Sequence, residues 1–173
     1  MAEGLQHAGE FRVDMCELIT SSGMRIDLTT SVMGLTLFED ISSLTVSGSI
    51  VISDSVNMVS HGPIIGQEYL HLKIRTPGFT KEGDGVIDFS ENVFLVNSVS
   101  AREKVKNNIQ VYSLNFVSQE LIKNQRLKVT QSLTASWSDI VKKMLTDNSY
   151  LDTKKNMVIE PSAGIKKFVS PNI

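Results

Sequence analysis

The clearest pattern in the chain is an alternation of apolar and polar side chains between Ser43 and Ser55. One side of the extended strand that it predicts carries Leu44, Val46, Gly48, Ile50 and Ile52, as the period of two of a half-buried strand requires. The other side carries hydroxyl groups and one valine, at Thr45, Ser47, Ser49, Val51 and Ser53, with no charge before Asp54. A strand face that meets water usually carries charged side chains, so this face is expected to meet another protein surface.

Further strands are predicted by the same alternation over 11–19, 24–29, 68–76, 87–100 and 106–119. The segment 33–41 is apolar but irregular and fits either a strand or a connecting loop, and 127–132 fits one more strand. The Ser-Ser-Gly step before Met24 is turn chemistry, so 11–19 and 24–29 are expected to form a hairpin.

Helical segments are predicted in three places. Residues 54–62 fit one helical turn, with an N-cap at Asp54 or Ser55. The hydrophobic period changes from that of strands to that of helices after residue 118, where 119–126 fit a short helix. The clearest helix covers 136–145, where an apolar stripe recurs at helical spacing and comprises Trp137, Ile140, Val141, Met144 and Leu145. Ser136 with Asp139 three residues later resembles a capping box.

Together these elements predict a mainly β fold with minor α content. Strands at short, regular spacing favour an antiparallel barrel or a two-sheet arrangement. We expect a flexible N-terminus over 1–10, a β-barrel domain over 11–132, and an amphipathic helix with the start of a second subdomain over 133–173. We also expect the chain to be the front part of a longer polypeptide.

Composition changes this picture in one respect, which is charge. The 173 residues are 41 % hydrophobic and 21 % charged, which is typical of a packed globular chain. Residues 1–100 carry 5 Lys/Arg against 13 Asp/Glu, a net −8, whereas 101–173 carry 12 against 6, a net +6. This asymmetry fits two solvated faces, and it also fits a polar molecule that docks head to tail.

The single cysteine, Cys16, excludes an internal disulfide and favours a reducing compartment. The N-terminus shows neither the basic nor the apolar region of a signal peptide, and no apolar run approaches the length of a spanning helix. We therefore expect a soluble intracellular product. Separately, we expect the chain to need no cofactor.

Catalytic and metal-binding patterns are weak. A metal site from His61 and His71 with Asp54 or Glu68 is conceivable, but the histidines lack the usual ligand spacing. No G-x-S-x-G elbow, P-loop or dinucleotide fingerprint occurs. The basic segment 123–128 lacks interleaved aromatic residues, which argues against a nucleic-acid strip. These observations favour a scaffold or assembly role over an enzyme.

Several phrases together resemble the N-terminal region of the baseplate hub proteins of contractile-tailed bacteriophages. They are IVISDSVNMVSHGPIIGQEYLHLKIRTP, which contains Pro63 to Leu70, then VYSLNFVSQELIKNQ, the helix SWSDIVKKML and the closing IEPSAGIKKFVSPNI. No single phrase is diagnostic, and their order and spacing carry the resemblance over roughly residues 12–173. Hubs of that family are longer, with a second tube-like barrel.

The resemblance implies a tail-tube-like domain in a homotrimer whose ring joins the tail tube to the central spike and lets DNA pass. It implies a location in the virion baseplate after assembly in the host cytoplasm. It also implies tube, spike and baseplate wedge proteins as partners, with no specific nucleic-acid binding and no membrane contact. The interface- or bore-facing residues would be Thr45, Ser47, Ser49, Val51, Ser53, Asp54, Glu68 and Asp88.

Two alternatives stay open. The spike-base module of a type VI secretion-like machine shares the tube-like barrel, and a β-helical spike domain downstream would favour it. A small tail-associated hydrolase is the alternative from another class, and loss of cell-wall hydrolysis on substitution of His61 or His71 would favour that one.

Overall fold

The computed structural model describes residues 9–43, 45–62, 64–78, 85–106 and 108–169, and the side chains of residues 60 and 61 lie outside the description. The chain forms two compact units, of which the first ends at Ser118 and the second begins at Gln119. We call them the β unit and the C-terminal unit. The sequence prediction places the boundary between 132 and 133, after the short helix, whereas the two compact units divide before that helix.

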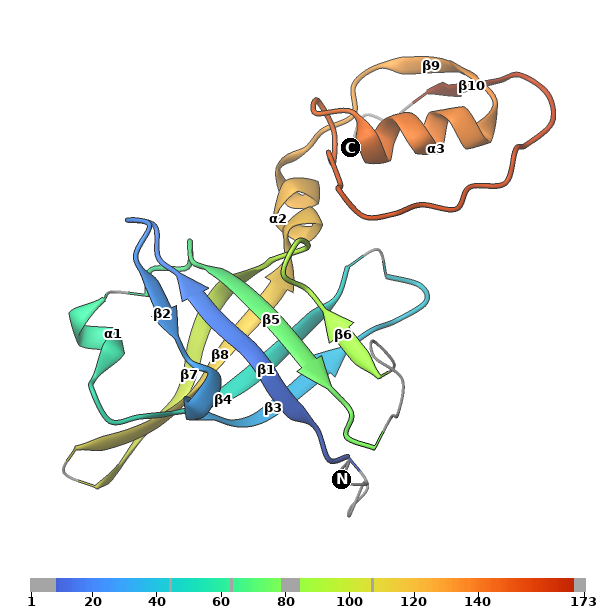
Figure 1. Cartoon of the computed structure of the whole chain (residues 1–173). Coiled ribbons are helices and arrows are strands. Elements are labelled where there is room, and N and C mark those ends of the chain that lie inside the picture. The colour runs from blue at the N-terminus through green and yellow to red at the C-terminus, as the bar shows by residue number, and fades with distance from the viewer. Residues whose placement is uncertain (1–8, 44, 63, 79–84, 107, 170–173) are drawn as a thin grey trace. The chain divides into compact units, whose positions relative to one another are not determined.

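The β unit is built on one eight-stranded antiparallel sheet in the order β2-β1-β5-β7-β8-β4-β3, with β6 beside β5 (Figure 1). Its strands are β1 (Arg12–Ile19), β2 (Arg25–Asp27), β3 (Val32–Phe38), β4 (Ser47–Asp54), β5 (Tyr69–Arg75), β6 (Val86–Asp88), β7 (Phe94–Lys106) and β8 (Ile109–Ser118). A short 3₁₀ turn, Thr29–Ser31, connects β2 to β3, and a one-turn helix, α1 (Met58–His61), follows β4.

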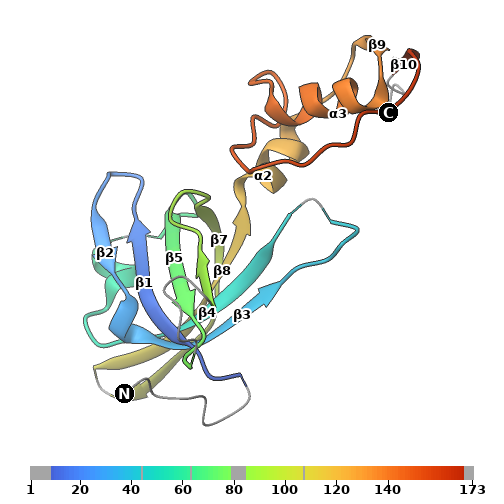
Figure 2. The same cartoon turned by 45° about the vertical axis from the view of Figure 1, so that its right-hand side comes forward.

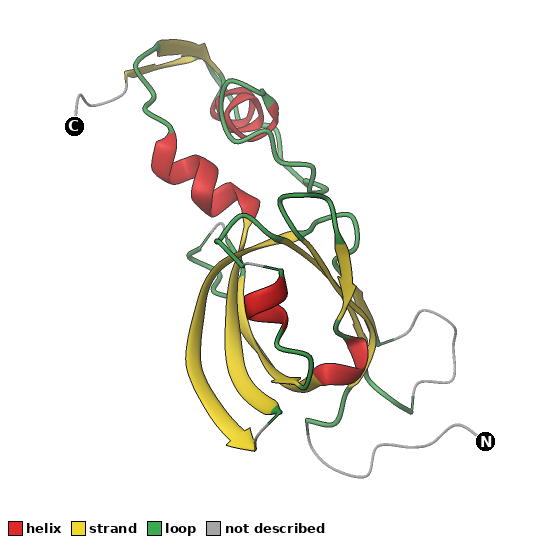
Figure 3. Ribbon diagram, turned by 90° about the vertical axis from the view of Figure 1, so that its left-hand side faces the viewer, coloured by secondary structure: helices red, strands yellow, loops and turns green. Residues whose placement is uncertain are grey.

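The sheet bends strongly around its inner face (Figure 3). Alternate residues of each strand point to that face and form a core of aliphatic and aromatic side chains, which includes Leu18, Ile50, Leu72, Phe94 and Phe116. Among the described residues, β2 and β3 at the two ends of the strand order do not pair with each other, so the sheet does not close into a barrel. The prediction of a mainly β, antiparallel fold is confirmed.

The strand predicted over Ser43 to Ser55 buries the side that its alternation predicts. Gly48, Ile50 and Ile52 are buried, and Ser49 and Val51 between them are half-buried. The regular strand begins at Ser47 rather than Ser43, and Leu44 lies outside the described residues. The irregular segment 33–41, left open between strand and loop, contains the strand β3.

Two predicted strands differ from the structure. The segment 87–100 is divided, because β6 ends at Asp88 and β7 begins at Phe94. The charged residues Arg102 to Lys104, which lie between the predicted strands 87–100 and 106–119, continue β7 into a long hairpin with β8, and β-bulges interrupt that hairpin. The predicted strand over 127–132 is wrong, because the strand in this region, β9 (Ser132–Ala135), begins where the prediction ends.

The C-terminal unit holds α2 (Gln119–Arg126), β9, α3 (Trp137–Thr146) and β10 (Lys166–Val169), with β9 and β10 paired antiparallel. Ser136 caps α3 as expected, because its Oγ accepts the Asp139 N–H at 3.2 Å. Trp137, the first residue of the predicted apolar stripe, has an exposed fraction of 46 %, and its ring meets Phe168 edge-on with a centroid distance of 6.1 Å. Ile140 of the same stripe is buried.

Candidate assembly surface

The outward face of the β unit is divided into two halves of different chemistry. On β1, β2, β5 and β6 it carries ion pairs: Arg75 Nε to Asp14 Oδ2 at 2.7 Å, Arg25 Nη1 to Glu17 Oε2 at 2.9 Å, and Lys73 Nζ to Asp88 Oδ2 at 2.9 Å. Solvent-exposed pairs of this kind contribute about 0–1 kcal/mol each. This half has the composition of a sheet face in contact with water.

The other half, on β3, β4, β8 and β7, has no charged side chain over most of its length. Cross-strand pairing aligns Thr36, Ser49, Asn115 and Ser98 in one row, and Gly34, Val51, Ser113 and Ser100 in the next. We call these two rows, together with Phe38 and Ser47 beside them, the neutral face. Glu103, which pairs with Val111, lies in the next cross-strand row toward the end of the β7–β8 hairpin. It is the first charged residue in that direction.

Hydrogen bonds already satisfy part of the polar surface of the neutral face. The Asn115 side-chain amide donates to Ser98 Oγ at 3.0 Å and to Ser100 Oγ at 2.9 Å. The sequence prediction named the β4 positions and missed these β7 and β8 partners. The alternation of Val111, Ser113, Asn115 and Val117 carries the same signal, but only the strand order shows that it lies beside β4.

Asp54 was predicted to face a bore or an interface, and this is wrong for the chain as folded. The residue is 1 % exposed. Its Oδ1 accepts the Val56 N–H at 2.9 Å and its Oδ2 the Met58 N–H at 2.7 Å, so it holds the start of α1 as an N-cap side chain would. Tyr112 Oη also donates to Oδ2, at 3.3 Å. Burial first, and then the Asp54 charge, raise the pKa of the Tyr112 hydroxyl well above its usual range.

Glu68 was predicted to face the same surface and is also buried, with no exposed fraction. Its carboxylate accepts three consecutive backbone N–H groups: Ile65 at 2.7 Å to Oε1, and Gly66 at 2.9 Å and Gln67 at 3.1 Å to Oε2. A carboxylate has the lone pairs to accept all three. The acid in the Gly66-Gln67-Glu68 phrase therefore fixes the loop that leads into β5.

The other predicted residues lie at or near the surface. Asp88 is exposed on β6, and its bonds to Ser90 first, and then to Lys73, lower the pKa of its carboxyl to about 2. Ser47, Ser49, Val51 and Ser53 are half-buried on the outward side of β4, and Thr45 is half-buried just before that strand. The structure thus places the β4 positions on one continuous face with β3, β7 and β8.

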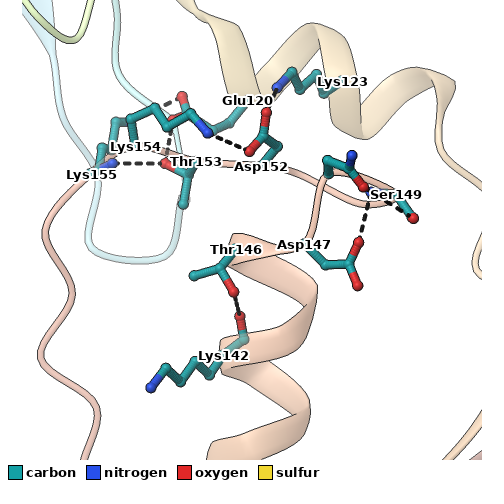
Figure 4. Close-up of polar contacts among 11 residues, drawn as sticks. Glu120, Lys123, Lys142, Thr146, Asp147, Ser149, Asp152, Thr153, Lys154 and Lys155 are labelled. Carbon is teal, nitrogen blue, oxygen red and sulfur yellow. Dashed lines mark hydrogen bonds and ion pairs between the residues drawn. The ribbon is translucent and has the colours of Figure 1, made fainter.

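The C-terminal unit holds a separate polar cluster between α2 and the segment after α3 (Figure 4). Glu120 Oε1 accepts the Thr153 hydroxyl at 2.6 Å, and Lys155 Nζ lies 3.2 Å from Glu120 Oε2. Asp152 contacts Lys123 at 3.4 Å and Lys154 at 2.6 Å. Burial would raise the pKa of the Glu120 carboxyl, but the bonds from Thr153 and Lys155 outweigh it and lower that pKa.

The contacts of this cluster hold two segments of the C-terminal unit together. They tie the segment that follows α3 to the helix that begins the unit, and they join residues about 30 positions apart in sequence. A groove of about 480 Å³ lies nearby, lined among others by Ser138, Lys142, Lys155 and Pro161. Lys155 is already engaged by Glu120, so one of the two lysines of the groove is neutralised.

Metal and thiol chemistry receive no support from the described part of the chain. No group of three or more His, Cys, Asp or Glu side chains gathers there in a metal-binding arrangement. Asp54 and Glu68 of the conceivable metal site are committed to backbone N–H groups, and the side chain of His61 lies outside the description. Burial first, with the charge of Asp27, raises the pKa of the Cys16 thiol to about 12.

None of the described helices is long and apolar enough to span a membrane. No protein-family model matches the chain, and no curated protein matches it either.

Proposed function

We propose that the chain is a structural component of a contractile phage tail, a baseplate hub-like protein whose β unit has a tail-tube-like fold and assembles into a ring through the neutral face. The observation that supports this most directly is the division of the outward sheet face. The half on β1, β2, β5 and β6 carries several ion pairs, whereas the half on β3, β4, β8 and β7 has no charged side chain over two cross-strand rows.

The energetics of desolvation explain why this division favours an interface. Removing a charged side chain from water costs several kcal/mol unless it is fully paired, and the centres of protein interfaces are accordingly depleted of charged residues. Ser, Thr and Gly are small, so a partner backbone can approach closely. The Asn115 amide keeps two hydrogen bonds to Ser98 and Ser100 when water leaves.

The phrases that resemble hub proteins supply the biological setting. In this proposal the chain forms a homotrimer, contacts tube, spike and wedge proteins in the virion baseplate, and catalyses no reaction. The β unit, residues 1–118, carries 8 Lys/Arg against 14 Asp/Glu, a net −6. An acidic ring wall would repel DNA phosphates and let DNA pass without sticking.

The test is native mass spectrometry of the full chain over a concentration series, with two matched variants. Ser49→Arg puts a cation in the middle of the neutral face, where its cross-strand partners are Thr36 and Asn115. His71→Arg puts the same side chain on the ion-paired half, opposite Glu17. Both positions are half-buried on outward-facing strand surfaces.

We expect the wild-type chain and His71→Arg to form trimers or multiples of trimers, and Ser49→Arg to stay folded and to form no trimer. A wild-type chain that stays monomeric at every concentration would refute assembly through this face. Equal assembly of the two variants would show that copies meet through another surface.

A further inference from the structure

The β unit has two oppositely charged poles, which lie at the two ends of strand β4. At one end, the β7–β8 hairpin carries Arg102, Lys104 and Lys106 against one acid, Glu103. At the other end, the β3–β4 loop carries Glu39 and Asp40 and no cation. Figures 1 and 2 show this hairpin and this loop projecting from opposite ends of the sheet.

The hairpin is built to present its lysines. A bulge interrupts β7 between Ser100 and Glu103, where Ala101 has a φ of 50°. There Arg102 Nε donates to Gln110 Oε1 at 2.8 Å. Beyond that anchor the strand is exposed from Glu103 to Lys106, and neither lysine forms an ion pair with a described residue.

The loop presents its acids beside large apolar side chains. Asp40 Oδ1 accepts the Ser42 N–H at 2.7 Å, and the Asp40 carbonyl accepts the Ser43 N–H at 2.9 Å. This Asx turn leaves Ile41 fully exposed, next to Phe38 with an exposed fraction of 60 %. The hairpin offers an apolar counterpart in Val105, which is 58 % exposed.

One copy cannot bring its own poles together. The register pairs Phe38 with Ser47 at the loop end of β4, and Gln110 with Asp54 at the hairpin end. The eight residues of β4 separate the two ends, which is roughly 25 Å along the strand at about 3.3 Å per residue. The complementary charges can therefore meet only between molecules.

We propose that the exposed end of the β7–β8 hairpin of one copy, which carries Lys104 and Lys106 on its two faces, docks on the β3–β4 loop of a second copy, which carries Glu39 and Asp40. The contact is heterologous and runs head to tail, so it propagates from copy to copy. It uses the ends of the sheet, and it is independent of the neutral face, which lies along the strands.

The experiment is a charge exchange in the full chain, read by sedimentation velocity. Glu39→Lys with Asp40→Asn reverses the loop while Asn keeps the Asx turn. Lys104→Glu with Lys106→Glu reverses the hairpin. Glu91→Lys with Glu160→Gln changes the net charge by the same +3 as the loop variant, at exposed acids elsewhere in the chain. Thermal melting checks that each variant is folded.

We expect the wild-type chain and the Glu91 and Glu160 variant to form head-to-tail oligomers that dissociate between about 0.1 M and about 1 M salt, as the screening length falls from about 10 Å to about 3 Å. Each reversed variant alone should associate at least about tenfold more weakly, because its two poles then carry like charges. An equimolar mixture of the two reversed variants should associate again, because each now complements the other.

Failure of the mixture to associate would overturn the proposal, as would equal weakening by the control substitutions or a wild-type chain without salt-sensitive association. The Ser49→Arg variant separates this contact from the ring contact. It should keep the salt-sensitive association if the poles meet and only the neutral face is disrupted.

Discussion

Gly48 is the residue at which the packing of the β unit leaves least room, and Gly48→Ala is the sharpest test of the fold. Gly48 lies on the inner face of β4, beneath the ring of Phe116. A Cβ at this position would lie 2.5 Å from Phe116 Cζ and 2.5 Å from the backbone oxygen of Thr36. Real Cβ atoms essentially never approach other heavy atoms so closely.

The size of the effect follows from what can move. The Phe116 ring is packed in the core and meets the Phe94 ring at a centroid distance of 4.7 Å. The Thr36 oxygen belongs to β3, so moving it disturbs the pairing with β4. Overpacking of this kind costs about 1–3 kcal/mol or more, and the lower chain entropy of alanine returns about 0.4–1 kcal/mol. We expect a net loss of about 1–2 kcal/mol in the free energy of unfolding of the β unit.

Gly34→Ala is the matched control. Gly34 lies on the neighbouring strand β3, and its added Cβ would meet nothing closer than 3.9 Å, at Val51 Cγ2. Because its backbone does not adopt a positive φ, alanine fits there without strain. We expect this variant to be as stable as wild type, or more stable by about 0.5 kcal/mol.

The assay is urea denaturation followed by far-ultraviolet circular dichroism, which reports the sheet. Tryptophan fluorescence is unsuitable, because the only tryptophan, Trp137, lies in the C-terminal unit. If Gly48→Ala and Gly34→Ala have the same midpoint and slope, the close approach of Phe116 and Thr36 to Gly48 is not present in the protein. Additional replacement of Phe116 by Leu should recover only part of the loss, because the Thr36 oxygen remains.

Three further predictions concern buried or hydrogen-bonded ionisable side chains. The pKa of the Glu120 carboxyl is lowered in the folded C-terminal unit. The contribution of Glu120 to stability is therefore present above the unfolded pKa of about 4.3 and is lost as the pH falls through the folded pKa. Unfolding followed by tryptophan fluorescence should show lower stability at acid pH, and the stability of Glu120→Gln should depend less on pH. Cys16 is buried and the pKa of its thiol is about 12, so thiol reagents should modify it only as fast as the β unit unfolds, and rapid modification of the native chain would contradict its placement. Glu68→Gln should cost about 1–3 kcal/mol by circular dichroism, because an amide offers one acceptor oxygen to three N–H groups; an unchanged midpoint would contradict the loop bonds.

The strands could be predicted because their signal is local. Alternation over β1, β4, β5 and β8 depends only on which side chains face a core, and each of these strands lies within or close to its predicted range. The helix α3 was predicted for the same reason, from its stripe and its Ser136 cap. The continuation of β7 through Arg102, Glu103 and Lys104 was not predicted, because these residues are charged, and charge does not decide whether an exposed strand continues.

The candidate site was predictable only in part, because a surface is assembled from strands that are distant in sequence. The β4 half of the neutral face follows from one alternating segment, whereas its β7 and β8 partners depend on the strand order. Asp54 and Glu68 were misplaced for a related reason. An acid at the end of a strand looks solvated in the sequence, but at these two positions a turn brings backbone N–H groups onto the carboxylate and buries it.

The two proposed contacts, one through the neutral face and one between the ends of the sheet, require different kinds of side chain. A lateral contact along the strands must give up water over a broad area, which small uncharged side chains allow at low cost. An end contact is narrow, so it gains little from area and depends on charge to select and orient its partner. The β unit has uncharged rows along β4 and β8 and complementary charges at the ends of β4. Salt should therefore weaken the end contact and leave the lateral contact largely intact, and this difference separates the two without any substitution.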